Sequence, residues 1–300
     1  MRATRPARNR RRNLAVAVLA GAAAVVPGLS PAAANEVPER VMSLNVCTDQ
    51  LAMLLAAPGQ LISVSELAAD PGLSFHHARA AGFAKNRGLA EEVFLERPDL
   101  IVTGTYSLHN TTTLLTRLGF RVEAFDYGQT LGTVAPEIRR MGRLLGRSAA
   151  AESLATEFES SLAMVERSLC GAAPTAIAYD QNGIAMGSGT LVDSAMQAAG
   201  LRNIAAELGF AGMAPFPLEL LVQHRPQIIV LSEPLADTPS LADQIAGHPA
   251  IRALGQSSTR ITLPRGSASC GGPFIIEAIK ALRAARETLV PCPPLPGPSG

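Results

Sequence analysis

Short apolar runs alternate with helical patterns along much of the chain. Residues 41–44 and 175–179 are mostly apolar runs of strand length, and residues 51–57 and 191–199 follow them with helical spacing. Thr190 stands where a helix cap is favoured. Strands that alternate with helices are typical of α/β folds, in which helices cover both faces of a parallel sheet. The pattern therefore predicts the α/β class.

One stretch of the chain recurs later in the sequence. Residues 89–102 align without a gap with residues 217–230, and a glutamate, an Arg-Pro pair and an Ile-Val pair recur 128 positions apart. Each copy predicts a short helix that stops before the proline, followed by a strand buried on both faces. The repeat indicates two similar lobes.

Residues 130–169, between the two halves, have helical periodicity. Ser148 stands at a favoured cap position, after Gly146. About twenty helical residues span roughly 30 Å, which is the width of one domain. We therefore expect a long bridging helix between the lobes. Two apolar stripes carry the periodicity: Ile138, Met141, Leu144 and Leu145, then Leu154, Phe158, Leu162 and Val165.

The first 34 residues have the pattern of a secretory signal. Residues 2–12 contain six arginines and no acid, residues 14–26 are apolar, and residues 32–34 are three alanines. A basic head, a short apolar segment and a small-residue site predict a signal peptide that is cut after Ala34, by the Sec or the twin-arginine route. The apolar segment is shorter than the roughly twenty residues that a membrane span needs.

Composition and charge exclude some classes of function. The chain is 47% apolar and 17% charged, which suits a large core rather than disorder. Without residues 1–34, the 26 basic residues fall to 20 against 25 acidic ones. An acidic chain with 4% aromatic residues and no Trp is not expected to bind nucleic acid. We expect a soluble chain outside the cytoplasm with no nucleic-acid partner.

The chain has four cysteines and no C-x-x-C motif, which excludes a zinc ribbon. Four cysteines fit an oxidising compartment, but they allow three pairings, and spacing does not choose among them. They are Cys47, Cys170, Cys270 and Cys292.

Several motifs together resemble the substrate-binding proteins of ABC importers that serve ferric siderophores, haem and cobalamin. The resemblance covers nearly all of residues 38–290, and it is carried by residues 40–51, 90–102, 115–119, 189–193, 199–200 and 218–226 with the bridging helix. It implies two Rossmann-like α/β lobes with parallel sheets, joined by a single long bridging α-helix, with a ligand cleft between the lobes.

The resemblance also implies a domain plan and a function. The expected parts are an N-terminal lobe over 38–129, a helical connector over 130–169, a C-terminal lobe over 172–290 and an unstructured tail over 291–300. We expect a binding protein, not an enzyme, with no catalytic residue, no metal site and no cofactor of its own. It would be a periplasmic monomer that delivers a ferric siderophore, or alternatively cobalamin, to an ABC permease in the inner membrane. Haem is disfavoured because the family's tyrosine ligand is missing from residues 82–85.

The resemblance places two kinds of site. Glu91 and Glu219 correspond to the glutamates, one on each lobe, that dock on basic residues of the permease. The cargo is expected at the carboxyl ends of the strands, where loops of open α/β sheets bind ligands. The residues expected there are Cys47, Thr105, Tyr106, Tyr127, Gln181, Asn182, Phe216, Arg265 and Cys270.

Cys47 and Cys270 should lie near helix N-termini on the cleft side, where thiol pKa values fall. Three alternatives stay open: a disulfide at the cleft, contact with the ligand, or a nucleophile of an extracytoplasmic enzyme. In the enzyme alternative His76 is the base and Asp49 orients it. Cys170 and Cys292 are the candidates for a second disulfide, at the base of the second lobe.

Overall fold

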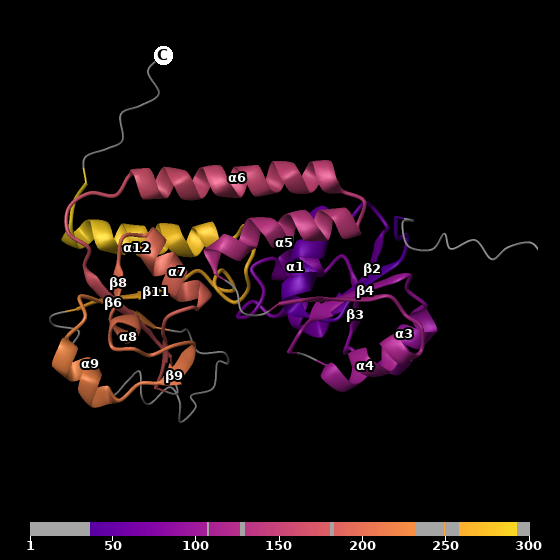
Figure 1. Cartoon of the computed structure of the whole chain (residues 1–300), viewed down its shortest axis with the longest axis horizontal. Helices are drawn as coiled ribbons and strands as arrows, with labels where there is room; N and C mark the ends of the chain where they lie inside the picture. Colours follow the sequence, from indigo (N-terminus) through magenta and orange to yellow (C-terminus); the bar gives the residue numbers. More distant parts are fainter. Residues whose placement is uncertain are drawn as a thin grey trace, which may run out of the picture. The chain divides into compact units, whose positions relative to one another are not determined.

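The computed structural model of the protein describes residues 37–106, 108–126, 130–180, 183–231, 249 and 258–292 (Figure 1). From Val37 on, the chain forms one compact unit. The predicted signal peptide and three predicted cargo contacts, Tyr127, Gln181 and Asn182, lie outside the described residues, as does residue 293 onward of the predicted tail.

Within the described residues, the first lobe contains a five-stranded sheet with all strands parallel, in the order β3-β2-β1-β4-β5. Its central strands β1 and β4 are buried along almost their whole length because helices cover both faces. The strands are β1 (Val41–Ser43), β2 (Leu61–Ser65), β3 (Ala84–Asn86), β4 (Leu100–Gly104) and β5 (Val122–Phe125). The helices are α1 (Val46–Leu55), the 3-10 helix η1 (Glu66–Ala69), α2 (His77–Ala80), α3 (Ala90–Glu96) and α4 (His109–Arg117).

The second lobe contains six strands within the described residues, on the path β11-β10-β6-β7-β9 with β8 beside β6. Its strands are β6 (Thr175–Tyr179), β7 (Ile184–Met186), β8 (Arg202–Asn203), β9 (Met213–Pro215), β10 (Ile228–Leu231) and β11 (Thr259–Thr262). Its helices are α7 (Leu191–Ala198), α8 (Ile204–Glu207), α9 (Leu218–His224) and α12 (Ile275–Leu289).

The second sheet is mixed, which corrects the expectation of a purely parallel sheet. Strands β6, β8, β10 and β11 pair in parallel, but β7 is antiparallel to β6 and to β9. The chain reverses after β6 because the amide of Ile184 donates to the Asp180 carboxylate at 3.1 Å and Gly183 has φ +73°, a left-handed conformation that glycine tolerates.

The predicted repeat is confirmed in the backbone. Helices α3 and α9 both end at an arginine with positive φ, Arg97 at 48° and Arg225 at 44°. The following proline disfavours a further helical turn, so the chain enters β4 or β10 after it. Thr190 also caps α7 as expected, since its side chain accepts from the amide of Asp193.

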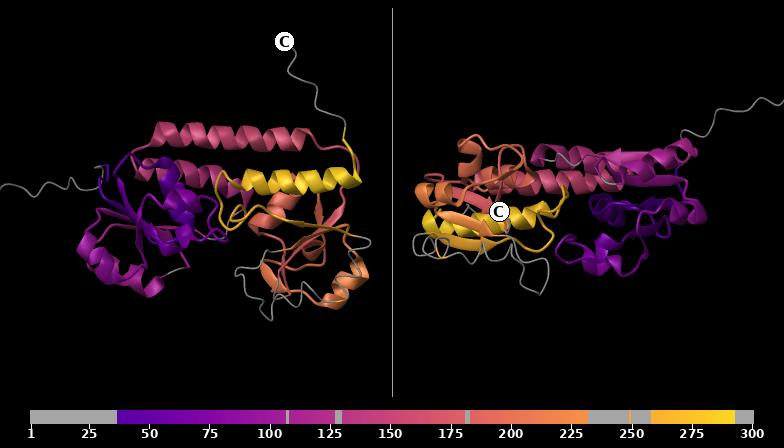
Figure 2. Two further views of the ribbon diagram at one scale, coloured as in Figure 1. Left: turned by 180° about the vertical axis from the view of Figure 1, so that it is seen from behind. Right: turned by 90° about the horizontal axis from the view of Figure 1, so that it is seen from below.

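The long helix is α6 (Ser148–Arg167), which follows α5 (Leu131–Leu144). It runs alongside α5 and α12 (Figure 1), and the view from behind shows the same arrangement (Figure 2). Ser148 is the first residue of α6 and not its cap, because Arg147 has the non-helical cap conformation. Arg139 of α5 is ion-paired with Glu152 and Glu159 of α6, which links the two antiparallel helices.

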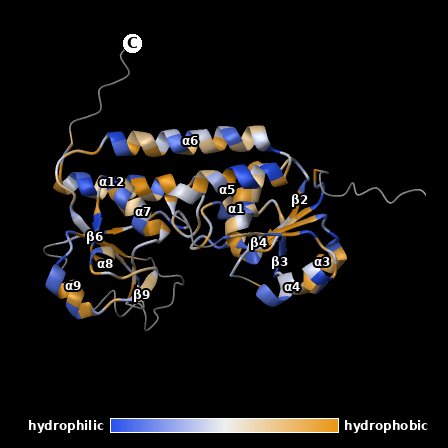
Figure 3. Cartoon of the chain, viewed as in Figure 1, coloured by the Kyte–Doolittle hydropathy of each residue, from blue (hydrophilic) through white to orange (hydrophobic). Residues whose placement is uncertain are grey.

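Apolar residues gather on the strands and on the inner faces of the helices (Figure 3). The largest cluster of buried side chains is continuous from the first lobe to the second, through Leu51 of α1, Leu131 of α5, Leu191 of α7 and Ile275 of α12. The two lobes therefore share a core on the side of the helices. In the described part of the chain, no helix has the length and apolar character of a membrane span.

Candidate functional site

Thr105, Tyr106 and Arg265 occupy the carboxyl ends of strands, as predicted, and all three are exposed. Thr105 follows β4, and its hydroxyl donates to the Asp126 carboxylate at 3.3 Å after β5. Arg265 follows β11 in the second lobe. Parallel strands place these loops at one edge of each sheet, so both lobes offer polar side chains there.

Phe216 differs from its expected role as a cargo contact. It is 3% exposed and packs in a core cluster of the second lobe, with its ring against Tyr179 and Phe210. The Tyr179 hydroxyl donates to the Phe216 carbonyl at 3.2 Å, and burial raises the pKa of Tyr179. Phe216 therefore supports the strand edge from within the core.

Cys47 and Cys270 form a disulfide that joins the start of α1 to the segment before α12, with the two Cα atoms 5.2 Å apart. The Asn45 side chain accepts from the Cys47 amide at 2.9 Å and caps α1. The disulfide alternative is thus confirmed. Neither sulfur is a thiol in this structure, so neither is a thiolate ligand or a nucleophile.

The two lobes touch beside this disulfide. We define the lobe junction as Gln50, residues 74–76, residues 266–267 and Phe274. The Gln50 side-chain oxygen accepts from the amides of Phe75 and His76, at 2.8 and 3.3 Å. The rings of Phe75 and Phe274 stack with centroids 5.6 Å apart. A Cβ at Gly266 would lie 2.3 Å from the Phe75 nitrogen, so only glycine allows this approach.

Several polar atoms of the lobe junction are buried and have no hydrogen-bond partner within the described residues. Burial and the charge of nearby Arg79 also lower the pKa of His76. Most buried polar atoms in proteins have a partner, so the lobe junction is an exception. The atoms are Gln50 Nε2, Ser74 Oγ, His76 Nε2 and Ser267 Oγ.

Asp49, next to Gln50 on α1, is fully buried and bonds to the end of β2. Its carboxyl accepts from the Ser65 amide at 3.1 Å and from the Ser65 hydroxyl at 2.5 Å. Burial raises the pKa of Asp49 to about 7, although the Ser65 and Ser43 hydrogen bonds and the charge of Lys85 oppose this. The carboxyl is therefore a proton-binding group inside the first lobe.

The enzyme alternative is not assembled in the described residues. Asp49 bonds to Ser65 and not to His76, and both candidate nucleophiles are in a disulfide. Among the same residues, no group of three or more His, Cys, Asp or Glu side chains could hold a metal ion. The contacts of Asp49 and of the Cys47–Cys270 disulfide instead connect loops and lobes to one another.

Glu91 of α3 and Glu219 of α9 are exposed, and in the described chain neither makes an ion pair. Both helices lie on the side of the sheets away from α6 (Figure 1). Leu95, one turn after Glu91, is 80% exposed and Phe94 is 58% exposed. These three side chains share one face of α3, by their helical spacing.

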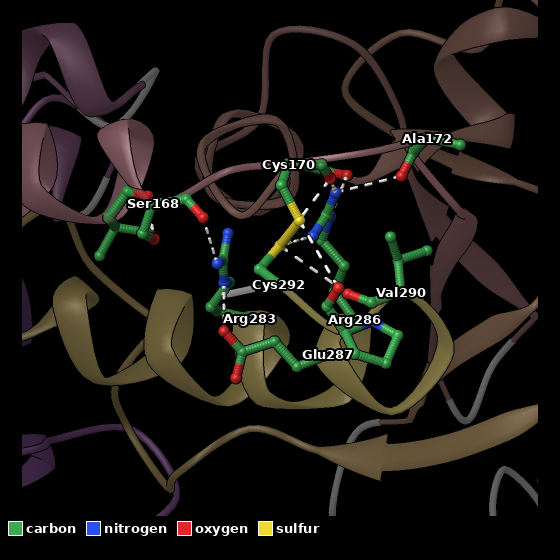
Figure 4. The surroundings of a disulfide bond; sticks show 11 residues. Ser168, Cys170, Ala172, Arg283, Arg286, Glu287, Val290 and Cys292 are labelled. Carbon is green, nitrogen blue, oxygen red and sulfur yellow. Dashed lines mark hydrogen bonds and ion pairs between the residues drawn. A yellow bond between two sulfur atoms is a disulfide. The ribbon is translucent and has the colours of Figure 1, made fainter. Parts of the chain in front are cut away.

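The second predicted disulfide, Cys170–Cys292, is also confirmed and lies within the second lobe (Figure 4). Arg286 of α12 is 2% exposed beside it and donates to the carbonyls of Gly200, Cys170 and Ala172. We call this disulfide with Arg286 and its three carbonyls the staple.

Sequence reasoning missed Gln50, Phe75 and Phe274. The signal that could have indicated them is the close packing that Gly266 and Gly272 allow, and glycines in loops are too common to reveal it. The ring contact between Phe75 and Phe274 joins segments about two hundred positions apart, which no local pattern encodes.

A sequence profile of periplasmic binding proteins matches residues 41–255. The cobalamin-binding protein of Halobacterium salinarum is 25% identical over 197 residues, which are 64% of this chain and 53% of the relative. The chain spans about half the length of the curated relatives it matches.

Solved structures share the fold. The periplasmic haem-binding protein of Vibrio cholerae has a TM-score of 0.68 at 14% identity, with 84% of this chain and 99% of that chain covered. The periplasmic vitamin B12-binding protein of Vibrio cholerae has a TM-score of 0.66 at 18% identity, with 84% and 98% covered. At these identities the likeness shows the two-lobed fold.

Proposed function

Because the chain belongs to the periplasmic binding protein family, we propose that it is the extracytoplasmic binding component of an ABC importer, which captures a metal chelate and delivers it to a permease. The observation that carries this proposal is the pair of α/β lobes on α6 with a matched, exposed glutamate on each lobe. A binding protein of this kind needs no chemical step. Its work is to hold cargo in one arrangement of the lobes and to release it in another.

The cargo would lie where strands of both lobes end, since ligands of open α/β sheets bind there. Thr105 and Tyr106 of the first lobe and Arg265 of the second are exposed at these strand ends. Tyr127, Gln181 and Asn182 remain predicted contacts. This mixture of hydroxyl, ring and guanidinium groups suits a bulky chelate with polar edges.

Two cargoes have specific support. Cobalamin is favoured by the relative from Halobacterium salinarum, which is named for binding it. A ferric siderophore is favoured by Arg265, because a guanidinium pairs well with the anionic oxygens that many siderophores expose. Both are rigid metal chelates, so they make the same demand on the site.

A thermal-shift titration tests the cargo class. Cyanocobalamin, ferrioxamine B, haem, leucine and glucose are each added to the protein without residues 1–34, and melting is followed with a dye because the chain has no Trp. A chelate that binds the folded state at 100 times its Kd stabilises it by about 2.7 kcal/mol. A shift with leucine or glucose and with no chelate would overturn the proposal.

Docking is tested separately from cargo binding. Glu91→Lys and Glu219→Lys reverse the charge at two points, and we expect each to lower the rate of delivery to permease-containing vesicles about tenfold at low salt. Glu157→Lys is the matched control, since Glu157 is exposed on α6, on the other side of the lobes (Figure 1). All three variants should bind cargo normally. Equal loss in the control would refute docking through α3 and α9.

A further inference from the structure

We propose that the Cys47–Cys270 disulfide is a positioning element of the cargo site, which fixes the spacing between the wall from the first lobe and the wall from the second. This rests on the proposed function, because it assigns the cargo to the strand ends. The disulfide would hold the two walls together covalently, in addition to the packing between them.

The position of the bond supports this role. Cys47 lies in the first turn of α1, directly after β1, and Cys270 lies between β11 and α12. The same loop after β11 contains Arg265, a predicted cargo contact. The bond therefore joins the loops that leave the carboxyl ends of one strand in each sheet. Because Cys47 belongs to the first lobe and Cys270 to the second, the bond links the two lobes.

The noncovalent contacts described at the lobe junction are ring contacts of Phe274 with Phe75 and His76, one weak hydrogen bond and one close backbone approach. The rings of Phe75 and Phe274 stack, and the Ser269 hydroxyl is 3.5 Å from the Gly72 carbonyl oxygen, at the limit of a hydrogen bond. Backbone meets backbone at Gly266, where a side chain would not fit.

The same contact buries polar atoms at a cost. Gln50 Nε2, Ser74 Oγ and Ser267 Oγ are buried without partners in the part of the chain that the structure describes. Burying a polar atom without a hydrogen bond costs free energy, and this cost disappears when the contact opens and water binds the atom. These unpaired atoms weaken the noncovalent contact at this edge, and the disulfide holds it closed.

Opening would be local. The core that continues from α1 to α12 holds the lobes together on the side of α5 and α6. Without the disulfide, the segments at 74–76 and 266–270 separate, water reaches the polar atoms, and the two walls lose their fixed spacing. A bound chelate then leaves faster, while the surfaces of α3 and α9 are unchanged.

The test compares two double variants of the protein without residues 1–34. Cys47→Ser/Cys270→Ser removes the bond between lobes, and Cys170→Ser/Cys292→Ser removes the bond within the second lobe as the matched control. Hydrogen exchange is read at the amides of Phe75 and His76, which donate to Gln50. The probes for dissociation are cyanocobalamin and ferrioxamine B.

We expect exchange at these two amides to rise at least tenfold in the first variant and less than twofold in the control. Dissociation of the probe that binds the wild type should accelerate at least fivefold in the first variant alone. Unchanged exchange in the first variant would overturn the positioning role. Faster exchange with neither probe binding the wild type would leave the covalent link standing and would count against the proposed function instead.

A reversible form of the test guards against a variant that does not fold. In the Cys170→Ser/Cys292→Ser background, dithiothreitol reduces the remaining bond: two electrons and two protons pass to the two sulfurs, and the reagent becomes a cyclic disulfide. Exchange at Phe75 and His76 should rise on reduction and return after reoxidation. Exchange that stays slow through the cycle would refute the proposal.

Discussion

The two disulfides of this protein lie in opposite surroundings. At the staple, Arg286 donates to three carbonyls, and Arg283 donates to the Ser168 carbonyl and is ion-paired with Glu287 (Figure 4). Arg283 Nη1 is the one buried side-chain atom of these two arginines that has no partner within the described residues. At the lobe junction, four buried polar atoms have no partner within the described residues. The Cys170–Cys292 bond therefore lies in a region that hydrogen bonds also hold together. The Cys47–Cys270 bond closes a contact that buries polar atoms without hydrogen bonds.

The difference teaches that equal covalent bonds can have unequal roles. A disulfide limits the unfolded chain in both places, and this contribution depends on the length of the closed loop. Its effect on the folded protein depends on what the neighbouring groups would do without it. The hydrogen bonds from Arg286 to the three carbonyls can remain after the bond is removed, whereas the buried polar atoms of the lobe junction gain water.

The largest expected effect is on global stability, and it should be similar for both bonds. Loop-closure entropy gives about 5 kcal/mol for separations of 223 and 122 positions, and either double cysteine-to-serine variant should lose about 3 to 5 kcal/mol in urea unfolding. A difference above about 2 kcal/mol between the variants would mean that the local surroundings dominate stability as well.

Arg286→Met should lower the free energy of unfolding by about 3 kcal/mol, because three carbonyls lose a charged donor in a buried site. Arg202→Met is the control, since Arg202 pairs with Glu207 at the surface and should cost less than about 1 kcal/mol. Both are measured by urea unfolding. Equal losses would show that the staple network contributes little.

Asp49, next to Gln50 of the lobe junction, should make the free energy of unfolding depend on pH. Its pKa rises from 3.8 in the unfolded chain to about 7 in the folded protein, so between these values only the folded form holds the proton. Its contribution is therefore present below pH 4 and is lost as pH rises to about 7, by up to about 1.4 kcal/mol per pH unit.

Unfolding of the wild type and of Asp49→Asn, measured from pH 4 to 8, checks this sign. The difference between the two curves should fall with rising pH and level off above pH 7. A difference that stays constant over this range would contradict the raised pKa of Asp49.

The smallest expected effect is the difference in stability between removing a hydroxyl that has a hydrogen-bond partner and removing one that has none. Ser267→Ala removes a hydroxyl that has no partner in the described chain, and stability should stay within about 0.5 kcal/mol or rise. Ser258→Ala removes a buried hydroxyl that donates to the Pro226 carbonyl at 2.6 Å, and it should cost about 1 kcal/mol. A larger loss for Ser267→Ala would show that the lobe junction is better paired than its geometry indicates.

Local pattern predicted most of the framework correctly. The strands at 41–44 and 175–179, the repeated helix and strand, and the long connector helix all appear within a few residues of their expected places. The prediction failed where tertiary context decided. Strand β7 is antiparallel because of the turn at Asp180, and Phe216 lies in the core because Tyr179 and Phe210 pack on it. The domain boundaries at 130 and 172 remain predictions, since the chain from Val37 on forms one compact unit.

The sequence by itself determined which segments form strands and helices, and that one unit occurs twice, because periodicity, caps and Arg-Pro stops act between near neighbours. Only the tertiary structure decided which cysteines meet and which polar atoms lose their partners. Cys47 and Cys270 are brought together by the packing of helices from both lobes on one core. Such contacts depend on the summed geometry of many elements, which no short stretch of sequence contains.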